Sequence, residues 1–268
     1  MTPLAQRGAA LMGGVLRHAA PVSGGGLSQV LRIHLDDGRV AIVKHGPLAQ
    51  AEASMLRTIH EAGVPAPAVL GADSQTLVIE CLPTDGSLDN AWSDVGAQLA
   101  VLHATTGPGY GWPNAYAFDS VSIDNARTEC WPEFWAQRRL LPHLSKLPVS
   151  LGRRLERLAA DLPNRLPQQP AASLLHGDLW GGNVLVTGTR LSGLIDPACY
   201  YGHSEVDIAM LQLFDQPSPE FFEAYAPLQA GCAERLTIYR LWPALVHLLL
   251  FGGGYHAMVG RNLSAAGV

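Results

Sequence analysis

The fold is decided by one stretch of sequence, LLHGDLWGGNVLV at residues 174–186, together with LIDP at residues 194–197. It carries a carboxylate at Asp178, an amide at Asn183 and a second carboxylate at Asp196, between short apolar runs that are typical of β-strands. Oxygen ligands of these two kinds suit Mg²⁺, which takes its remaining ligands from water and from substrate phosphates. A carboxylate that stays off the metal can accept a hydroxyl proton. The stretch therefore predicts metal binding and proton transfer at one site.

The spacing of these three residues is that of a kinase catalytic loop. In such a loop an Asp positions the attacking hydroxyl, while an Asn and a later Asp hold magnesium. We therefore predict that Asp178 is the catalytic base and that Asn183 and Asp196 are metal ligands. Either fragment alone is more often a turn or a strand end, but the order and spacing of both together favour the functional interpretation.

A phosphotransferase also needs a cation for the nucleotide phosphates. Lys44, at the end of a predicted strand, is placed like the strand lysine of kinases. Glu52 lies early on the next predicted helix and is a candidate partner for Lys44. The alternative for each is an ordinary solvated side chain, and the connection of eight residues between them is short.

Two further segments are candidates for nucleotide binding. A glycine-rich loop lies upstream of Lys44, where backbone N–H groups would approach phosphate oxygens; its predicted binding residues are Gly24, Gly25, Gly26 and Ser28. Three glycines also make an ordinary hairpin turn, and the loop matches neither G-x-G-x-x-G nor the P-loop pattern. Where the next strand ends, Glu80 and Leu82 are expected to offer backbone groups to an adenine ring.

The chain changes character after residue 82. Alternation predicts strands at 30–35, 40–44 and 77–80, with a hairpin turn at 36–38 and a helix at 49–62 that Gly63 ends. Beyond Pro83 the patterns are mainly helical, at 92–105, 131–144 and 151–162, with a strand-rich insert at 174–195. We therefore predict an α+β, protein-kinase-like, two-lobed fold: a small β-rich ATP-binding lobe at 1–82 and a larger, mainly α-helical catalytic and substrate lobe at 83–268.

The composition points to a globular protein with a small-molecule partner. The chain has 268 residues, 48% of them hydrophobic, and a formal net charge of -5, so it can bury a core and lacks the basic character of a nucleic-acid-binding protein. The four cysteines form no C-x-x-C pair and are expected to be reduced and mostly buried. The apolar segment at 241–259 is interrupted by Pro243 and by glycines, and is expected to be a buried helix that ends or kinks near Gly252 rather than a membrane span. We expect a cytoplasmic protein; its oligomeric state is left open.

Two runs of sequence resemble one known family. The run HGDLWGGN at 176–183 and the run IDPACYYGHSEVD at 195–207 are similar to the fructosamine kinase (ketosamine-3-kinase) family, within the aminoglycoside phosphotransferase and protein-kinase-like superfamily. The wider group shares the His-Gly-Asp and Asn elements, whereas the Trp after Asp-Leu and the Asp-Pro-Ala-x-Tyr-Tyr-Gly-His-x-Glu run are typical of the fructosamine kinases. Weaker matches cover most of the chain. The segment before Glu52 is shorter than in the family, and the region after Trp112 lacks a clear match.

The resemblance implies an activity and a set of supporting residues. The activity is transfer of the ATP γ-phosphoryl group, with Mg²⁺, to the 3-hydroxyl of a ketosamine, free or protein-bound, which yields an unstable phosphate and frees the amine: a deglycation repair reaction. Trp180 is expected to stack on the sugar or, equally, to be a buried core residue. A supporting role around the catalytic loop is expected, foremost for Asp207, and also for His176, His203 and Glu205. His103 is interpreted as structural.

Two other functions stay open at this level. One is phosphorylation of another small alcohol, such as an aminoglycoside, a choline-like compound or a sugar. The other is a non-catalytic, kinase-like binding protein, which is disfavoured because Lys44, Asp178, Asn183 and Asp196 are all chemically competent.

Overall fold

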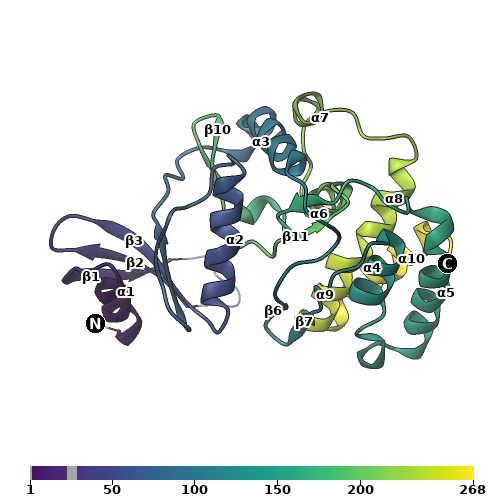
Figure 1. Ribbon diagram of the computed structural model, residues 1–268, viewed down its shortest axis with the longest axis horizontal. Coiled ribbons are helices and arrows are strands. Elements are labelled where there is room, and N and C mark those ends of the chain that lie inside the picture. Colours follow the sequence, from purple (N-terminus) through teal and green to yellow (C-terminus); the bar gives the residue numbers. More distant parts are fainter. Residues whose placement is uncertain (1, 23–28) are drawn as a thin grey trace. The chain divides into compact units, whose positions relative to one another are not determined.

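The computed structural model describes residues 2–22 and 29–268 and is shown in Figure 1. The glycine-rich loop residues Gly24, Gly25, Gly26 and Ser28 lie outside the described residues. The chain forms two compact units. The first unit comprises Met1–Leu102, Gly181–Ala198 and Ser218–Tyr225; the second comprises His103–Trp180, Cys199–Pro217 and Ala226–Val268. The first unit thus extends beyond residue 82, and the functional division at that residue stays a prediction.

The first unit is built around a five-stranded antiparallel sheet. Its strands have the spatial order β1-β2-β3-β5-β4 and the bounds β1 (Leu16–Pro21), β2 (Val30–Leu35), β3 (Val40–His45), β4 (Val69–Ala72) and β5 (Thr76–Glu80). The predicted strands at 30–35, 40–44 and 77–80 are confirmed, and Gly38 in the turn after β2 has a φ of +87°, which glycine adopts without strain.

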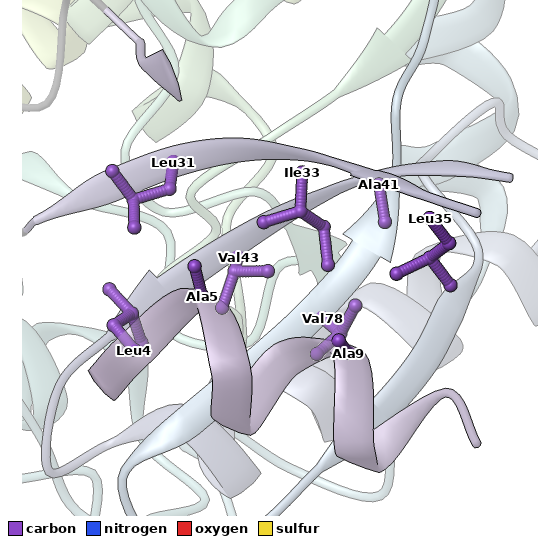
Figure 2. Close-up of a cluster of buried hydrophobic side chains, with 9 residues drawn as sticks. All are labelled: Leu4, Ala5, Ala9, Leu31, Ile33, Leu35, Ala41, Val43 and Val78. Atoms are coloured by element: carbon purple, nitrogen blue, oxygen red, sulfur yellow. The ribbon is translucent and has the colours of Figure 1, made fainter. Parts of the chain in front are cut away.

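The helix α1 (Pro3–Leu11), which the sequence analysis did not predict, packs on one face of this sheet. Figure 2 shows its side chains against those of β2, β3 and β5; the cluster consists of Leu4, Ala5, Ala9, Leu31, Ile33, Leu35, Ala41, Val43 and Val78. A Cβ atom at Gly8 would lie 2.5 Å from Val43 Cγ2, so only glycine lets the helix approach the sheet this closely. Burial of these apolar side chains is what fixes the helix, since an isolated helix of 9 residues is unstable in water.

The helix α2 (Ala49–Glu61) follows β3 and packs on β4 and β5. Ala53, Leu56 and Ile59 are buried along one stripe, as their spacing predicts, and Gly63 follows the helix with a φ of +84°. The other elements of the first unit are η1 (Leu88–Asn90), most of α3 (Trp92–Ala104), η4 (Gly181–Asn183), the hairpin of β9 (Val184–Thr187) and β10 (Arg190–Leu194), and α7 (Pro219–Tyr225).

The second unit is mainly helical. It contains the short hairpin of β6 (Tyr116–Phe118) and β7 (Val121–Ile123), the pair β8 (Ser173–Leu175) and β11 (Tyr200–Gly202), and the helices α4 (Trp131–Trp135), η3 (Leu144–Lys146), α5 (Val149–Arg165), α6 (Glu205–Phe214), α8 (Cys232–Tyr239), α9 (Leu241–Phe251), η5 (Gly253–Tyr255) and α10 (His256–Ala265). The α+β class predicted from the sequence is confirmed.

Three details of the second unit correct or confirm sequence-based expectations. The helix predicted at 131–144 is interrupted, because α4 continues as a π-helical turn over Ala136–Leu140 that carries the buried Arg139 onto the ring of Tyr200, 4.2 Å from its centroid. The predicted end of the apolar helix near Gly252 is confirmed, with α9 ending at Phe251. In the described part of the chain, no helix is both long and apolar enough to cross a membrane.

The cysteines differ from expectation in their burial. All four are free, and their reduced state stays a prediction. Only Cys199 is buried; the other three are partly exposed, so the expectation that the cysteines are mostly buried is wrong.

Candidate active site

A lysine and two carboxylates lie together in the first unit. Lys44 Nζ, on β3, lies 2.5 Å from Glu52 Oε1 and 2.5 Å from Asp196 Oδ1. Glu52 is in the first turn of α2, and Asp196 follows β10 with a φ of +54°, a left-handed conformation that non-glycine residues rarely adopt. Such backbone strain is often retained where it serves a site. The pairing of Glu52 with Lys44, which the sequence left open, is therefore present in the structure.

The ionisation of this cluster follows from its burial. Burial alone lowers the pKa of Lys44, but the negative charges of Glu52 and Asp196 outweigh it and hold the pKa above its usual range. Burial also raises the pKa of the Glu52 carboxyl, opposed by Lys44 and reinforced by the like charge of Asp196. Lys44 is only 9% exposed and stays charged, so it presents a fixed positive charge at the end of β3.

Asn183 directly precedes β9, and Asp196 follows the end of β10. Asn183 is buried in the short helix η4, and its backbone carbonyl accepts a hydrogen bond of 3.0 Å from the N–H of Ile195, the residue before Asp196. The side chain of Asp196 is 44% exposed. An amide oxygen and a carboxylate are hard oxygen donors that suit Mg²⁺. Among the described residues no cluster of three or more His, Cys, Asp or Glu could hold a metal ion, so a metal here would depend on this mixed amide and carboxylate pair.

In the second unit, one buried carboxylate holds the backbone of the His-Gly-Asp loop. Asp207, in the first turn of α6, accepts hydrogen bonds from the N–H of His176 at 2.7 Å and from the N–H of Gly177 at 3.0 Å. His103 Nε2 lies 3.1 Å from the same carboxylate. Asp178 is partly exposed beyond this loop, and its own N–H donates to His176 Nδ1 at 3.3 Å. Asp207 therefore fixes the loop that carries Asp178, as a charge-assisted double hydrogen bond can.

His203 and Glu205 make their hydrogen bonds to α8. Glu205 accepts two hydrogen bonds from the guanidinium of Arg235, at 2.7 and 2.6 Å. His203 Nδ1 lies 2.8 Å from the hydroxyl of Tyr239, which itself accepts a hydrogen bond from Trp131 Nε1 at 2.8 Å. These contacts join the start of α6 to α8, and a supporting role for the catalytic loop remains a prediction for both residues. Neither Arg235 nor Tyr239 was singled out from the sequence, because nothing in local spacing reveals a partner about 30 residues away.

The state of His203 gives a prediction about acid stability. Burial lowers the pKa of His203 to about 4, against about 6.5 in an unfolded chain, although the nearby Glu205 opposes the shift. On acidification, His203 therefore becomes protonated at a higher pH in the unfolded chain than in the folded protein. The unfolding free energy decreases for this reason as the pH falls from about 6.5 to 4. In His203→Gln, which cannot titrate, we expect the fall in unfolding free energy over this range to shrink by on the order of 3 kcal/mol. Urea unfolding at pH 7, 5.5 and 4 measures it; equal pH dependence in variant and wild type would contradict it.

Trp180 is 42% exposed, which excludes the interpretation that it is a core residue. It follows Leu179, which is fully buried and anchors the chain beside it. An exposed indole is available to a ligand, since an aromatic face suits the apolar C–H surface of a sugar.

A cavity of about 460 Å³ lies in the first unit at the end of β5; it is lined by Arg32, Cys81, Leu82, Pro83, Thr84 and Asp85. Leu82, predicted to face an adenine ring, is among these residues. Glu80 is not; its carboxylate accepts a hydrogen bond from the N–H of Ala68 at 3.2 Å. Sequence reasoning missed Arg32, although its alternation with the apolar residues of the predicted strand would have placed it on the opposite face of the sheet.

The sheet with its buried Lys44–Glu52 pair, and the helical unit with its His-Gly-Asp loop, define a protein-kinase-like phosphotransferase. Solved structures of low identity agree in fold: a macrolide 2'-phosphotransferase from Brachybacterium faecium has 20% identity and a TM-score of 0.62, and covers 96% of each chain.

Comparison with more similar proteins gives the family. The family model for fructosamine kinase matches residues 11–265. A protein of Enterococcus faecium named "Probable ketoamine kinase" is 33% identical over 91% of this chain and 93% of its own length, and one of Staphylococcus aureus is 30% identical over 92% of each. A solved structure from Thermobifida fusca, named "putative fructosamine-3-kinase", has 32% identity and a TM-score of 0.89, and covers 98% of each chain. The chain belongs to the fructosamine kinase family and is a phosphotransferase; as a kinase, it uses ATP.

Proposed function

We propose that this protein transfers the γ-phosphoryl group of ATP, in the presence of Mg²⁺, to the 3-hydroxyl of a ketosamine such as a fructosamine or ribulosamine. The phosphorylated adduct is unstable and releases the amine, so the reaction serves deglycation repair. The observation that carries the proposal is the cluster of buried Lys44 and Glu52 with the partly exposed Asp196, because it provides one fixed cation and a carboxylate for the metal within a chain of this family.

Asp178 carries out the proton transfer in this proposal. Its carboxylate accepts the proton of the 3-hydroxyl while that oxygen forms a bond to the γ-phosphorus and the bond from phosphorus to the β-phosphate oxygen breaks. The hydrogen bonds from His176 and Gly177 to Asp207 support this role, since they hold the loop in place. Trp180 offers its exposed face to the sugar.

Lys44 binds the nucleotide phosphates, and Asn183 with Asp196 would hold Mg²⁺. The metal supplies neutralisation of the charge that develops on the transferred phosphoryl group. Glu52 fixes the rotamer of Lys44, so the ammonium group keeps its direction when nucleotide enters.

The cavity at the end of β5 receives the adenine, with backbone groups of the segment from Glu80 to Leu82 along the edge of the base. The lining of that cavity supports this assignment. The role of Gly24, Gly25, Gly26 and Ser28 in covering the phosphates stays a prediction. The four free cysteines fit a reducing, cytoplasmic setting.

The direct test is ADP release from ATP and Mg²⁺, with ribuloselysine, fructoselysine and an aminoglycoside as acceptors. We expect release that requires a ketosamine and Mg²⁺, and the two lysine adducts to rank the preferred sugar. Release with the aminoglycoside alone would replace the ketosamine assignment by that of an antibiotic-type phosphotransferase. If the protein binds ATP but no acceptor stimulates ADP release, the protein would instead be a kinase-like binding protein.

A further inference from the structure

Arg32 lies on the opposite face of the sheet from α1. The neighbouring side chains of β2, at Leu31 and Ile33, point into the cluster beneath α1, as Figure 2 shows. Successive side chains of a strand point to opposite faces, so Arg32 points away from that cluster. Its side chain is exposed, whereas Leu31 and Ile33 are buried.

The register of the sheet places Arg32 on the same face as Lys44. Val30 of β2 is paired with Lys44 of β3, and Arg32 is paired with Ile42. Residues directly opposite each other in an antiparallel pair share a face. Arg32 is therefore displaced from the Val30–Lys44 pair by two residues, or about 7 Å, along the sheet. With Lys44 at the nucleotide phosphates, as proposed above, Arg32 lies farther along the nucleotide, away from the phosphates.

Arg32 lines the cavity at the end of β5, and its side chain has no hydrogen-bond or ion-pair partner among the residues that the structure describes. Of the residues lining this cavity, Arg32 and Asp85 are charged. Asp85 accepts a hydrogen bond from the hydroxyl of Thr187 at 2.5 Å, which is the main reason that its pKa is lowered. Arg32 makes no hydrogen bond or ion pair within residues 2–22 and 29–268. The rest of the lining is the run of residues 81–85, whose backbone suits the edge of a base.

We propose that Arg32 stacks its guanidinium on the face of the adenine ring and thereby contributes to nucleotide affinity. A guanidinium is planar and only weakly hydrated, and it stacks readily on aromatic rings, which a lysine ammonium does not reproduce. Cation–π attraction of this kind contributes about 0.5–2 kcal/mol, or roughly 3- to 30-fold in binding. The inference rests on the proposed function, because it takes the cavity to be the adenine site.

The test measures equilibrium binding rather than activity. ATP and adenosine are titrated against the wild type, Arg32→Ala, Arg32→Lys and the control Arg17→Ala, with calorimetry for ATP and displacement for adenosine. Arg17 is an exposed arginine of β1 and does not line the cavity. We expect Arg32→Ala to raise the Kd of ATP and that of adenosine by the same factor, roughly 3- to 30-fold. Arg32→Lys should lose most of the same affinity, and Arg17→Ala should bind as the wild type does.

Each other outcome overturns the inference in a distinguishable way. Weaker ATP binding with unchanged adenosine binding would make Arg32 a phosphate ligand. Wild-type affinity in Arg32→Lys would show that charge alone suffices, and wild-type affinity in Arg32→Ala would show that Arg32 takes no part. In these three cases the proposed kinase function survives. If the wild-type protein itself binds no ATP, the proposed function fails, and the inference with it.

Discussion

Asp178→Asn is expected to lower kcat by roughly 10²- to 10⁴-fold, because an amide cannot accept the proton of the attacking hydroxyl. The substitution keeps the shape of the side chain. It also leaves the loop intact, since the hydrogen bonds that hold it are made by backbone groups of His176 and Gly177 to Asp207. ATP affinity and the unfolding temperature should therefore stay close to those of the wild type. The measurement is acceptor-dependent ADP release, with ATP binding followed separately.

Asp119→Asn is the matched control for this prediction. Asp119 lies in the turn between β6 and β7 with a φ of +49°, a conformation that Asn tolerates as well as Asp does. The same chemical change there should leave turnover within a factor of two or so of the wild type, as expected for a surface position. Retained turnover in Asp178→Asn would show that another group accepts the proton.

Asp207→Asn is expected to reduce both stability and turnover. The buried carboxylate accepts hydrogen bonds from two backbone N–H groups and lies 3.1 Å from His103 Nε2. An amide presents its NH₂ group to at least one of these donors, so we expect a loss of about 1.5–3 kcal/mol in unfolding free energy, the range for hydrogen bonds to a charged group. The loop that carries Asp178 then loses its fixed position, which should lower kcat at least tenfold while the KM for ATP changes little.

Urea unfolding and steady-state kinetics at a temperature where the variant is folded separate these two effects. Asp124→Asn is the control in the same unit, since Asp124 is half-exposed and its ion pair with Arg138 lies at the surface. We expect that substitution to change the unfolding free energy by less than about 1 kcal/mol. If Asp207→Asn lost stability but kept the wild-type kcat when folded, the carboxylate would be structural only.

Local sequence patterns were sufficient to predict the elements whose formation depends mainly on residues close together in the chain. Alternation over β2 and β3, the apolar stripe of α2 and the glycines that end α2 and α9 were all recognised, because each depends on neighbours within a few residues. The helix α1 and strand β1 were missed. Residues 3–11 are rich in alanine and glycine, and residues 16–21 do not alternate cleanly. The helix α1 is stabilised by packing on the sheet, and β1 by pairing with β2.

The candidate site divides in the same way. The motif around Asp178 and the spacing of Asn183 and Asp196 could be recognised in the sequence, since kinase chemistry requires particular residue types at short spacing. The pairing of Lys44 with Glu52 stayed open, because a helix-surface glutamate is usually solvated. The partners of Asp207, at His103 and at the backbone of residues 176–177, were not predicted in detail. Arg32, which has no hydrogen-bond partner among the described residues, was overlooked.

The sequence by itself determined the strands β2, β3 and β5, the helix α2, the residue types of the predicted site and the family, since these follow from local periodicity and from motifs. Tertiary structure alone decided that Lys44 meets Asp196, 152 residues away, and that a carboxylate on α6 holds a loop 30 residues earlier. The reason is physical. A side chain's burial, its charge partners and the face of the sheet to which it points arise only when distant segments pack together, because local spacing specifies direction along one element and not what lies opposite.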